Sequence, residues 1–413
     1  MPFRAALSGL NAAQSDLRVI GNNVANAATT GFKKSRTEFA DVIAASNFGA
    51  SGNAIGSGVR VANIAQQFSQ GVVSFTDNNL DLAISGGGFF VLDDNGTRAY
   101  TRAGNFGIDQ SGGLVNALGQ SLVAFQADTN GNITGQTGPL QLDLSDISPK
   151  ATAAIEVGMN LDANTGTNAF SPAINPANPA SYDTSTSLTV FDSLGRPHLG
   201  TVYLQKAAGA GVWNSELYLD GTAAGNRVVP TAGSTITFGA DGTLSLPAGG
   251  TLAYNAFAVV PANALALTVD FTGTTPSTQY GSAFSVNSLQ QDGYATGRIS
   301  SIDIAESGSI SARFTNGQTR TMGQVALANF TNPQGLLPLG DNAWAEGFTS
   351  GQPLVSAPGT SSLGVIQSGA LEGSNVDITE MLVGMITAQR NFQANAQVIS
   401  TADAITQTII NIR

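Results

Sequence analysis

Both ends of this chain carry apolar residues at helical spacing, and this feature limits the possible folds more than any other. From Ile378 to the last of the 413 residues, apolar side chains recur every three or four positions, and no glycine or proline follows Gly384. At about 1.5 Å per residue such a helix would reach roughly 54 Å, which is far longer than a typical globular helix. Asp377 and Glu380 form a variant of the capping box at its start. We therefore predict one long C-terminal helix.

The N-terminal segment predicts a second amphipathic helix. From Phe3 to Ala27 its apolar residues alternate three and four positions apart, as in a coiled-coil seam. Gly9 and Gly21 each cost about 1 kcal/mol of helix propensity relative to alanine, so this helix should be weak alone. We expect the two apolar stripes to pack against each other and against other copies, although packing of two helices within one monomer fits the pattern equally well. The predicted seam residues are Phe3, Leu7, Leu10, Leu17, Ile20 and Val24 in the first helix, and Ile378, Leu382, Met385, Phe392, Ile399 and Ile409 in the second.

The charge distribution argues against a nucleic-acid partner. The net charge is −11, and residues 1–40 carry five basic and two acidic side chains, so the remaining 373 residues sum to −14. Neutralising phosphates requires clustered Lys and Arg, and the chain has only four lysines. There is neither an apolar run of about 18 residues nor a secretory signal pattern. We therefore expect no membrane insertion, and any export must use a route without a cleaved signal.

The middle of the chain changes to the alternation typical of strands. Short strands separated by turns such as Asp94-Asn95-Gly96 follow Leu80, and the pattern returns from Gly297 to Phe330 around Thr315-Asn316-Gly317. The segment between them predicts a second β domain inserted into a loop of the first. The predicted fold is α+β and mainly β, with paired terminal α-helices and two nested antiparallel β domains of the sandwich or barrel type. The predicted domains are a helical polymerisation domain (1–30 and 375–413), an extended linking segment (31–79 and 355–374), a first β domain (80–145 and 277–354) and an inserted outer β domain (146–276).

No arrangement of residues predicts catalysis, a metal site or a cofactor. The only histidine, His198, lies in a predicted turn, and without a nucleophile-elbow motif a Ser-His-Asp triad is disfavoured. Asp128-Thr129-Asn130-Gly131-Asn132 begins like a calcium loop, but Ile133 and Pro139 stand where such a loop needs Gly and Glu, which favours a hairpin turn. Gly86-Gly87-Gly88 precedes a strand rather than a helix, so phosphate binding is not supported. We expect a protein that is not an enzyme and binds no cofactor.

A secreted β-rich enzyme or carbohydrate-binding module is the alternative from another class. Such a module needs a surface cluster of aromatic or carboxylate side chains. Trp213, Tyr218 and Tyr254 are candidates for it, but packing in a core explains them equally well.

Three groups of residues resemble the signatures of bacterial flagellar rod and hook proteins. In chain order these are Leu7 to Leu10 with Asn22 to Asn26 and Thr30 to Lys33; Asp81 to Ile84 with Gly88 to Val91 and Tyr100 to Phe106; and Gly369 to Glu372 with Ser374 to Asp377 and Gln389 to Phe392. One departure is Gly87, where the family commonly has an acidic or polar residue. The signature residues that the resemblance marks are Asn22, Asn23, Asn26, Gly31, Phe32, Gly88, Phe89 and Phe90.

The resemblance implies a structural role in the flagellum, outside the cell. Rod members of the family mostly have one β domain and hook members have a second one inserted, so the inserted segment favours a hook-type protein over a distal rod protein. A hook-type member implies a curved, flexible tube of many copies that transmits torque from the rod to the filament. The implied partners are further copies of the chain, the rod, hook-filament junction and hook cap proteins, and the flagellar type III export apparatus. Because the terminal stripes lack partners before assembly, we predict that residues 1–30 and 375–413 are mobile in the monomer.

Overall fold

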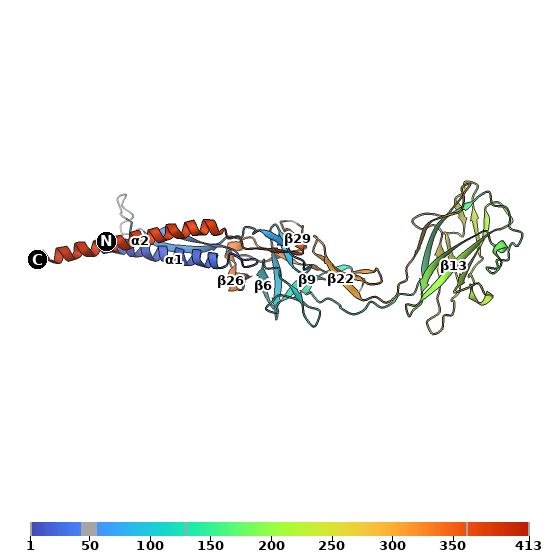
Figure 1. The fold of residues 1–413 in the computed structure, drawn as a ribbon, viewed down its shortest axis with the longest axis horizontal. Coiled ribbons are helices and arrows are strands. Elements are labelled where there is room, and N and C mark those ends of the chain that lie inside the picture. Colours follow the sequence, from blue (N-terminus) through green and yellow to red (C-terminus); the bar gives the residue numbers. More distant parts are fainter. Residues whose placement is uncertain (1, 43–55, 129, 361, 412–413) are drawn as a thin grey trace. The chain divides into compact units, whose positions relative to one another are not determined.

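The chain folds into two units, and one is inserted in the sequence of the other. The computed structural model describes residues 2–42, 56–128, 130–360 and 362–411 (Figure 1). Unit 1 comprises Met1–Leu144, Ser301–Arg313 and Thr319–Arg413, and unit 2 comprises Ser145–Ser300 and Phe314–Gln318. The chain segments that enter and leave unit 2 pair with each other, because Ile147 N donates to Gly297 O at 2.8 Å and Lys150 forms a similar bridge to Tyr294.

The terminal helices of unit 1 form an antiparallel pair. The helices are α1 (Pro2–Ala25) and α2 (Ile378–Asn411). Gly9 lies against Asn395, and a methyl group on Gly384 would lie 3.5 Å from Ile20 Cδ1, so residue numbers rise along one helix as they fall along the other. Both predicted helices are confirmed, and Figure 1 shows them side by side. Neither is long and apolar enough, within the described range, to cross a membrane.

The start of α2 is fixed by a side-chain cap. Asp377 Oδ1 accepts hydrogen bonds from the backbone N of Thr379 at 2.8 Å and of Glu380 at 3.2 Å. These bonds satisfy amides that have no partner within the helix. Glu380 does not turn back to complete a capping box and instead pairs with Lys34 Nζ at 3.0 Å.

A two-stranded ribbon follows α1 and packs along it. It consists of β1 (Ser35–Asp41) and β2 (Val59–Gln66), antiparallel, with a bulge between Glu38 and Phe39. This ribbon occupies part of the predicted linking segment, of which residues 43–55 lie outside the described residues. Trp344 Nε1 donates to Gln66 Oε1, which ties the end of the ribbon to the β structure of unit 1.

The β structure of unit 1 is built around one large sheet with an aromatic core. Phe89, Tyr100, Phe330 and Trp344 pack edge to face, with ring centroids 4.7 Å apart for Tyr100 and Phe330 and 5.8 Å apart for Phe89 and Trp344. The main strand order is β22 (Ile299–Ile304), β23 (Ser309–Phe314), β24 (Thr319–Val325), β9 (Ser121–Ala127), β5 (Phe89–Asp94), β6 (Thr97–Thr101), β27 (Ala343–Ala345) and β26 (Leu337–Gly340). Its further strands are β7 (Gly107–Ile108), β8 (Leu114–Val115), β10 (Ile133–Pro139), β25 (Leu327–Asn329) and β28 (Leu354–Ser356). Two small pairs are β4 (Leu82–Ser85) with β29 (Val365–Ser368) and β3 (Val73–Phe75) with β30 (Ala370–Glu372).

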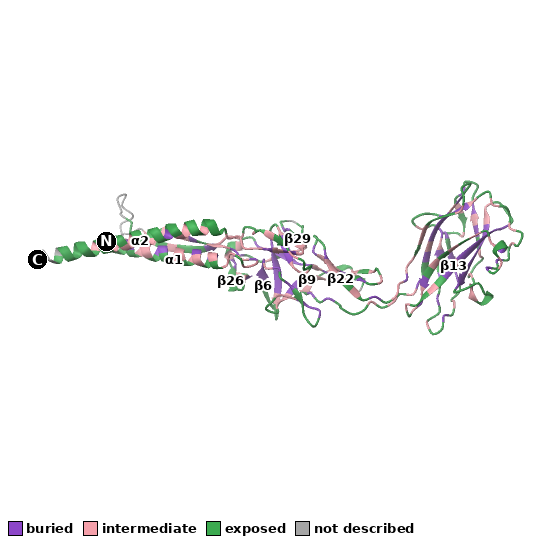
Figure 2. Cartoon of the chain, in the orientation of Figure 1, coloured by how far each residue is buried: buried purple, intermediate pink, exposed green. Residues whose placement is uncertain are grey.

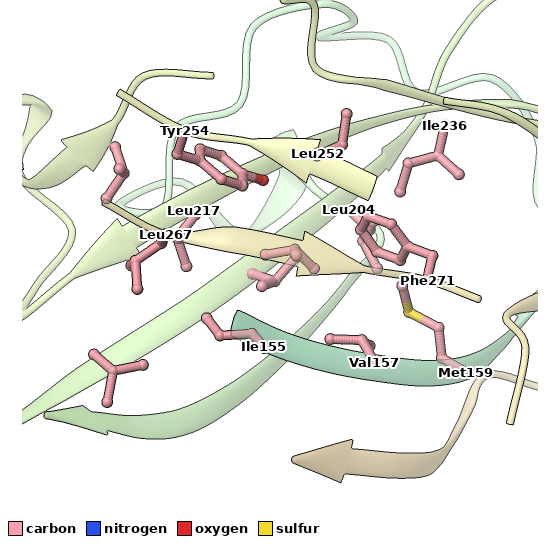
Figure 3. Packing of buried hydrophobic residues seen from close by; sticks show 14 of the residues in the cluster. Ile155, Val157, Met159, Leu204, Leu217, Ile236, Leu252, Tyr254, Leu267 and Phe271 are labelled. Carbon is pink, nitrogen blue, oxygen red and sulfur yellow. The ribbon is translucent and has the colours of Figure 1, made fainter. Parts of the chain in front are cut away.

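Unit 2 consists of two sheets with one shared core. Ile155 and Val157 of one sheet pack into the same cluster as Leu204 and Leu217 of the other (Figure 3). Trp213 belongs to the same cluster. One sheet has β12 (Thr184–Phe191), β13 (Pro197–Lys206), β14 (Val212–Leu219), β15 (Arg227–Val228), β16 (Thr235–Phe238) and β17 (Leu244–Leu246). The other has β18 (Thr251–Ala253), β19 (Thr268–Asp270), β11 (Ala154–Asp162), β20 (Thr278–Tyr280) and β21 (Ser285–Gln291).

Unit 2 differs from the sequence-based expectation in two respects. β11 pairs parallel to β19 and β20 and antiparallel to β21, so this sheet is mixed rather than antiparallel. Residues 277–300, which the sequence pattern places in the first β domain, supply β20 and β21 to unit 2. The physical reason is that β11 has partners on both sides only when these late strands close the sheet around it.

Candidate assembly interface

α2 carries large apolar side chains that the chain itself leaves uncovered. Seven of them expose between 46% and 67% of their surface, and Figure 2 shows the exposed side of the helix in green. They lie at the two ends of the helix and are Ile378, Leu382, Val383 and Ile386 near its start and Val398, Ile405 and Ile410 near its end. Exposed apolar groups of this size are typical of surfaces that contact another molecule.

The inner side of the helix pair is lined largely by small residues. Ala13 and Ile20 of α1 and Ala388 of α2 are buried. Small side chains let the helix axes approach closely, so the larger neighbouring side chains remain at the rim of the contact. The contact within one chain therefore uses only part of the apolar surface of the two helices.

The twelve predicted seam residues divide between this inner contact and the outer surface. Ile20 is buried within the pair. Six seam residues lie at the rim and are half-buried: Leu10, Leu17, Val24, Met385, Phe392 and Ile399. Those on the outer surface are exposed and are Phe3, Leu7, Ile378 and Leu382. The side chain of Ile409 lies outside the described residues.

An apolar groove of about 650 Å³ lies where α2 passes the start of α1. Phe3 forms one side of it, and Val398, Ala402 and Ile405 of α2 form the other. Because Phe3 and Ile405 are about half exposed, the groove is open to a neighbouring side chain. This end of the helix pair is therefore shaped to receive apolar residues from outside the chain.

A buried ion cluster anchors the helix pair to the β structure of unit 1. Glu372 accepts from Lys33 Nζ at 2.6 Å, from Arg102 Nη1 at 3.0 Å and from the backbone N of Gly71 at 2.8 Å. Lys33 also donates to Ser69 O at 2.7 Å. The side chains of Lys33 and Glu372 are fully buried, and that of Arg102 is nearly so. Four separate stretches of unit 1 therefore meet at one carboxylate.

The electrostatics of this cluster depend on all three charges. Burial lowers the pKa of Lys33 and of Arg102, and the adjacent carboxylate of Glu372 opposes that effect in both. Lys33 follows α1, Arg102 follows β6, and Glu372 ends β30 just before α2. A charge removed from water without its partner is costly, so the cluster holds these elements together in one arrangement.

The predicted signature residues at the end of α1 form a second anchor. Asn23 is buried, and its amide donates to Ser35 O at 2.7 Å and accepts from Ser35 N at 2.9 Å, which joins α1 to β1. Asn26, which directly follows α1, donates through its side chain to Asn22 O at 2.9 Å. Gly31 has a positive φ of 70°, and a Cβ there would lie 2.4 Å from Ala103 N. Only glycine fits this close approach of two backbones.

The remaining signature residues lie in the β structure. Gly88 has a φ of 112°, and a Cβ there would lie 2.7 Å from Leu363 Cδ2. Phe89 belongs to the aromatic core, and Phe90 packs edge to face on Phe106 at 5.4 Å. Phe32 is half-buried. The contacts of these residues support the fold.

The signature ranges contain Asn375 and the three charged residues of the ion cluster, but sequence reasoning assigned them no contacts and so missed the cluster. The Asn375 side chain accepts from Lys34 N at 2.7 Å and donates to Gln67 O at 2.7 Å. Charged residues make up only 11% of the chain, so Lys33, Arg102 and Glu372 are conspicuous by their rarity. Rarity alone is a weak signal, because no local pattern shows that these three side chains are buried together. In the described part of the chain, no three His, Asp or Glu side chains are placed to hold a metal ion.

Four family models match successive parts of the chain. Their descriptions are flagellar basal body rod protein (residues 3–33), flagellar hook protein FlgE/F/G D1 domain (83–162), flagellar basal body protein FlaE D2 domain (160–294) and flagellar basal body rod FlgEFG protein C-terminal (367–412). The order agrees with the nesting of unit 2 within unit 1.

Curated relatives match over the whole chain. The flagellar hook protein FlgE of Escherichia coli K12 is 37% identical over 417 residues, with 100% of both chains covered. The protein of the same name from Rhizobium meliloti is 33% identical, with 100% of this chain and 98% of the relative covered. Among solved structures, the flagellar hook protein FlgE2 of Helicobacter pylori matches with a TM-score of 0.55 at 15% identity, covering 72% of this chain and 100% of that one. This last likeness concerns the fold.

Proposed function

Because this chain belongs to the flagellar hook protein family, it is a structural subunit of the bacterial flagellar hook rather than an enzyme, and we propose that it polymerises through its terminal helices. The polymer is a curved, flexible tube that transmits torque from rod to filament. Localisation to the hook of the flagellum follows from the same family membership.

The single observation that carries the polymerisation proposal is the uncovered apolar surface of α2. Seven of its large apolar residues are about half exposed in the lone chain. Burying the rest of one such side chain is worth about 1 kcal/mol, so contacts along a whole helix, repeated in every subunit, supply a strong driving force. The predicted seam residues on the rim and outer surface are the proposed contacts between subunits.

The proposed partners other than further copies rest on the family alone. They are the rod, hook-filament junction and hook cap proteins and the type III export apparatus. Export of an unfolded chain is compatible with a protein that has no disulfide to form, since the sequence contains no cysteine.

Two alternatives are less well supported. A distal rod protein is disfavoured by the full-length match to hook proteins. A carbohydrate-binding module needs exposed aromatic residues, but Trp213, Tyr218 and Tyr254 are all buried in unit 2. Their burial agrees with a role in packing.

Electron microscopy of the purified full chain at high concentration tests the proposal. We expect hollow, curved tubes from the unsubstituted chain and none from Leu17→Asp or Phe392→Asp, whose β structure should remain folded by circular dichroism. Straight, rigid tubes would favour a rod protein. Persistent monomers, or normal tubes from both variants, would refute polymerisation through the seam.

A further inference from the structure

A row of exposed side chains on α2 faces away from α1. Ile378, Leu382, Ile386 and Arg390 follow one another at intervals of four residues and form a ridge about 18 Å long, and we call them the outer stripe. All four are exposed. The inner contact uses Gly384 and Ala388 on the opposite side of α2. The first three residues of the outer stripe are apolar, and the fourth adds a positive charge at one end.

A second exposed apolar surface lies on the hairpin of β26 and β27. Leu337, Leu339 and Phe348 form it, and we call them the hairpin patch. Phe348 is fully exposed, and the two leucines expose more than half of their surface. Gly347, next to Phe348, lies close enough to Leu337 that an added Cβ would be 3.4 Å from its Cγ, which places the backbone beside Phe348 against Leu337. β26 pairs only with β27 among the described strands, which leaves its other edge open.

The hairpin patch differs from the outer stripe in charge. Two acidic residues, Asp341 and Glu346, are exposed beside it. A hollow of about 390 Å³ lies next to Phe348 and has Glu346 in its wall. The positive end of the outer stripe therefore has a complementary negative charge on the hairpin.

The two surfaces lie at different faces of α1. On one side Ile20 packs against Gly384 of α2. On the other side Asn22 and Asn26 line a cavity together with the β26–β27 hairpin, and Asn342 Nδ2 of the hairpin donates to Thr30 O at 2.9 Å. In Figure 1 α2 runs along α1, whereas β26 lies beyond the end of α1. The hairpin thus lies near Asn22 and Asn26, away from the face of α1 that Gly384 of α2 contacts.

We infer that the outer stripe of one subunit binds the hairpin patch of the next. Two different, complementary surfaces of one unit make a head-to-tail contact, and such contacts build rings or open helical polymers rather than two-fold dimers. Leu382 and Ile386 pack on Leu337 and Phe348 in this contact, while Arg390 pairs with Glu346. The inference rests on the proposed function, because it names the surface that receives a neighbouring subunit.

Disulfide trapping in the assembled tube tests the contact directly, because the chain has no cysteine of its own. The full chain carrying both Leu382→Cys and Phe348→Cys is polymerised, oxidised and separated on a non-reducing denaturing gel. We expect a ladder of dimers, trimers and longer species. A mixture of the two single variants should stop at dimers, and each single variant alone should remain monomeric.

A matched pair, Leu382→Cys with Ile133→Cys, places the second thiol on β10 of the same unit and should give no ladder. Tubes without a ladder from the Leu382→Cys and Phe348→Cys chain, or an equal ladder from the control pair, would overturn the contact while leaving polymerisation intact. Failure of the unsubstituted chain to form tubes would instead contradict the proposed function.

Charge reversal gives an independent measurement if the cysteine variants assemble poorly. Arg390→Glu and Glu346→Arg, made singly, should each raise the concentration needed for tube formation about fivefold. With both substitutions in one chain, the required concentration should return to within about twofold of that of the unsubstituted chain, because the ion pair is re-formed with opposite signs. If the two increases in the required concentration multiply in the double variant, the contact between Arg390 and Glu346 is wrong.

Discussion

Lys33 Nζ lies 2.6 Å from Glu372 Oε1, although the two residues are 339 positions apart in the sequence, and neither side chain is exposed to solvent. The contact joins the chain leaving α1 to the chain entering α2. The cluster thus joins the helix pair to the β structure of unit 1, and we call it the joint.

Glu372→Gln should destabilise unit 1 by about 3–5 kcal/mol, because it leaves Lys33 and Arg102 buried without a counter-charge. The chain has two tryptophans, Trp344 in unit 1 and Trp213 in unit 2, so a Trp213→Phe background lets fluorescence follow unit 1 alone during urea unfolding. Glu38→Gln, in the exposed pair with Arg36, is the control and should change stability by less than about 1 kcal/mol. Equal effects of the two substitutions would show that the buried cluster is not a joint.

Asn23→Ala should lower the stability of unit 1 by about 1–3 kcal/mol, because it removes both hydrogen bonds from the buried Asn23 amide to the half-buried N–H and C=O of Ser35. Asn22→Ala changes the neighbouring, exposed amide and is the control. The same Trp344 fluorescence measures both. A similar loss from Asn22→Ala would mean that helix propensity, rather than the bond to β1, sets the effect.

Ile405→Asp should prevent tube formation and leave the unfolding of both units unchanged, because Ile405 is about half exposed and lines the groove beside Phe3. Thr408→Asp introduces the same charge at an exposed polar position one turn away and should still polymerise. Sedimentation after assembly, followed by electron microscopy of the pellet, distinguishes the two. Normal tubes from Ile405→Asp would exclude the groove from the subunit contact.

The helix pair should exchange its amide hydrogens quickly in the monomer and slowly in the tube. The reason is that much of its apolar surface lacks a partner before assembly. Hydrogen exchange with mass spectrometry on monomer and polymer measures this, with the peptide around Tyr100 in the core of unit 1 as an internal reference protected in both states. Full protection of α1 and α2 in dilute monomer would contradict the predicted mobility.

The stability of unit 2 should fall as the pH rises above 6.5. Partial burial lowers the pKa of His198, but hydrogen bonds to Asp220 and Asp192 outweigh it, so the pKa is raised above the usual 6.5. A raised pKa means that the folded state binds the proton more tightly, so the stabilisation is complete below pH 6.5 and is lost as the pH passes the folded-state pKa. Urea unfolding of a Trp344→Phe chain, followed through Trp213 from about pH 6 to about pH 9, measures it. His198→Gln should remove this pH dependence of the stability of unit 2. If the free energy of unfolding of that variant changes with pH as before, other groups cause the dependence.

Local sequence signals were enough to predict the elements whose structure is set by residues close together in the chain. The helices follow from apolar periodicity, and the hairpin between β5 and β6 follows from Asn95-Gly96, whose positive φ angles suit a tight turn. The strands β20 and β21 were not predicted, because segments such as Ser285–Gln291 are largely polar and resemble loops. Their structure comes from pairing with β11, which lies more than 100 residues earlier in the chain.

The candidate interface was predictable only in part, for a similar reason. Periodicity identifies Ile20 and Leu382 alike as members of an apolar stripe, yet one is buried against α2 and the other is about half exposed. Which residue faces which partner depends on the inner contact, where Ala13 and Ala388 permit close approach. The cluster around Glu372 depends on four stretches that are distant in sequence, so no local pattern could indicate it.

The bridges from Ile147 to Gly297 and from Lys150 to Tyr294 bring the entry and exit of unit 2 together. A domain whose own termini are adjacent could follow the same entry and exit, provided that it also accepts the turn Phe314–Gln318, which belongs to unit 2. A hook subunit built in this way keeps both terminal helices and the Glu372 cluster outside the inserted module.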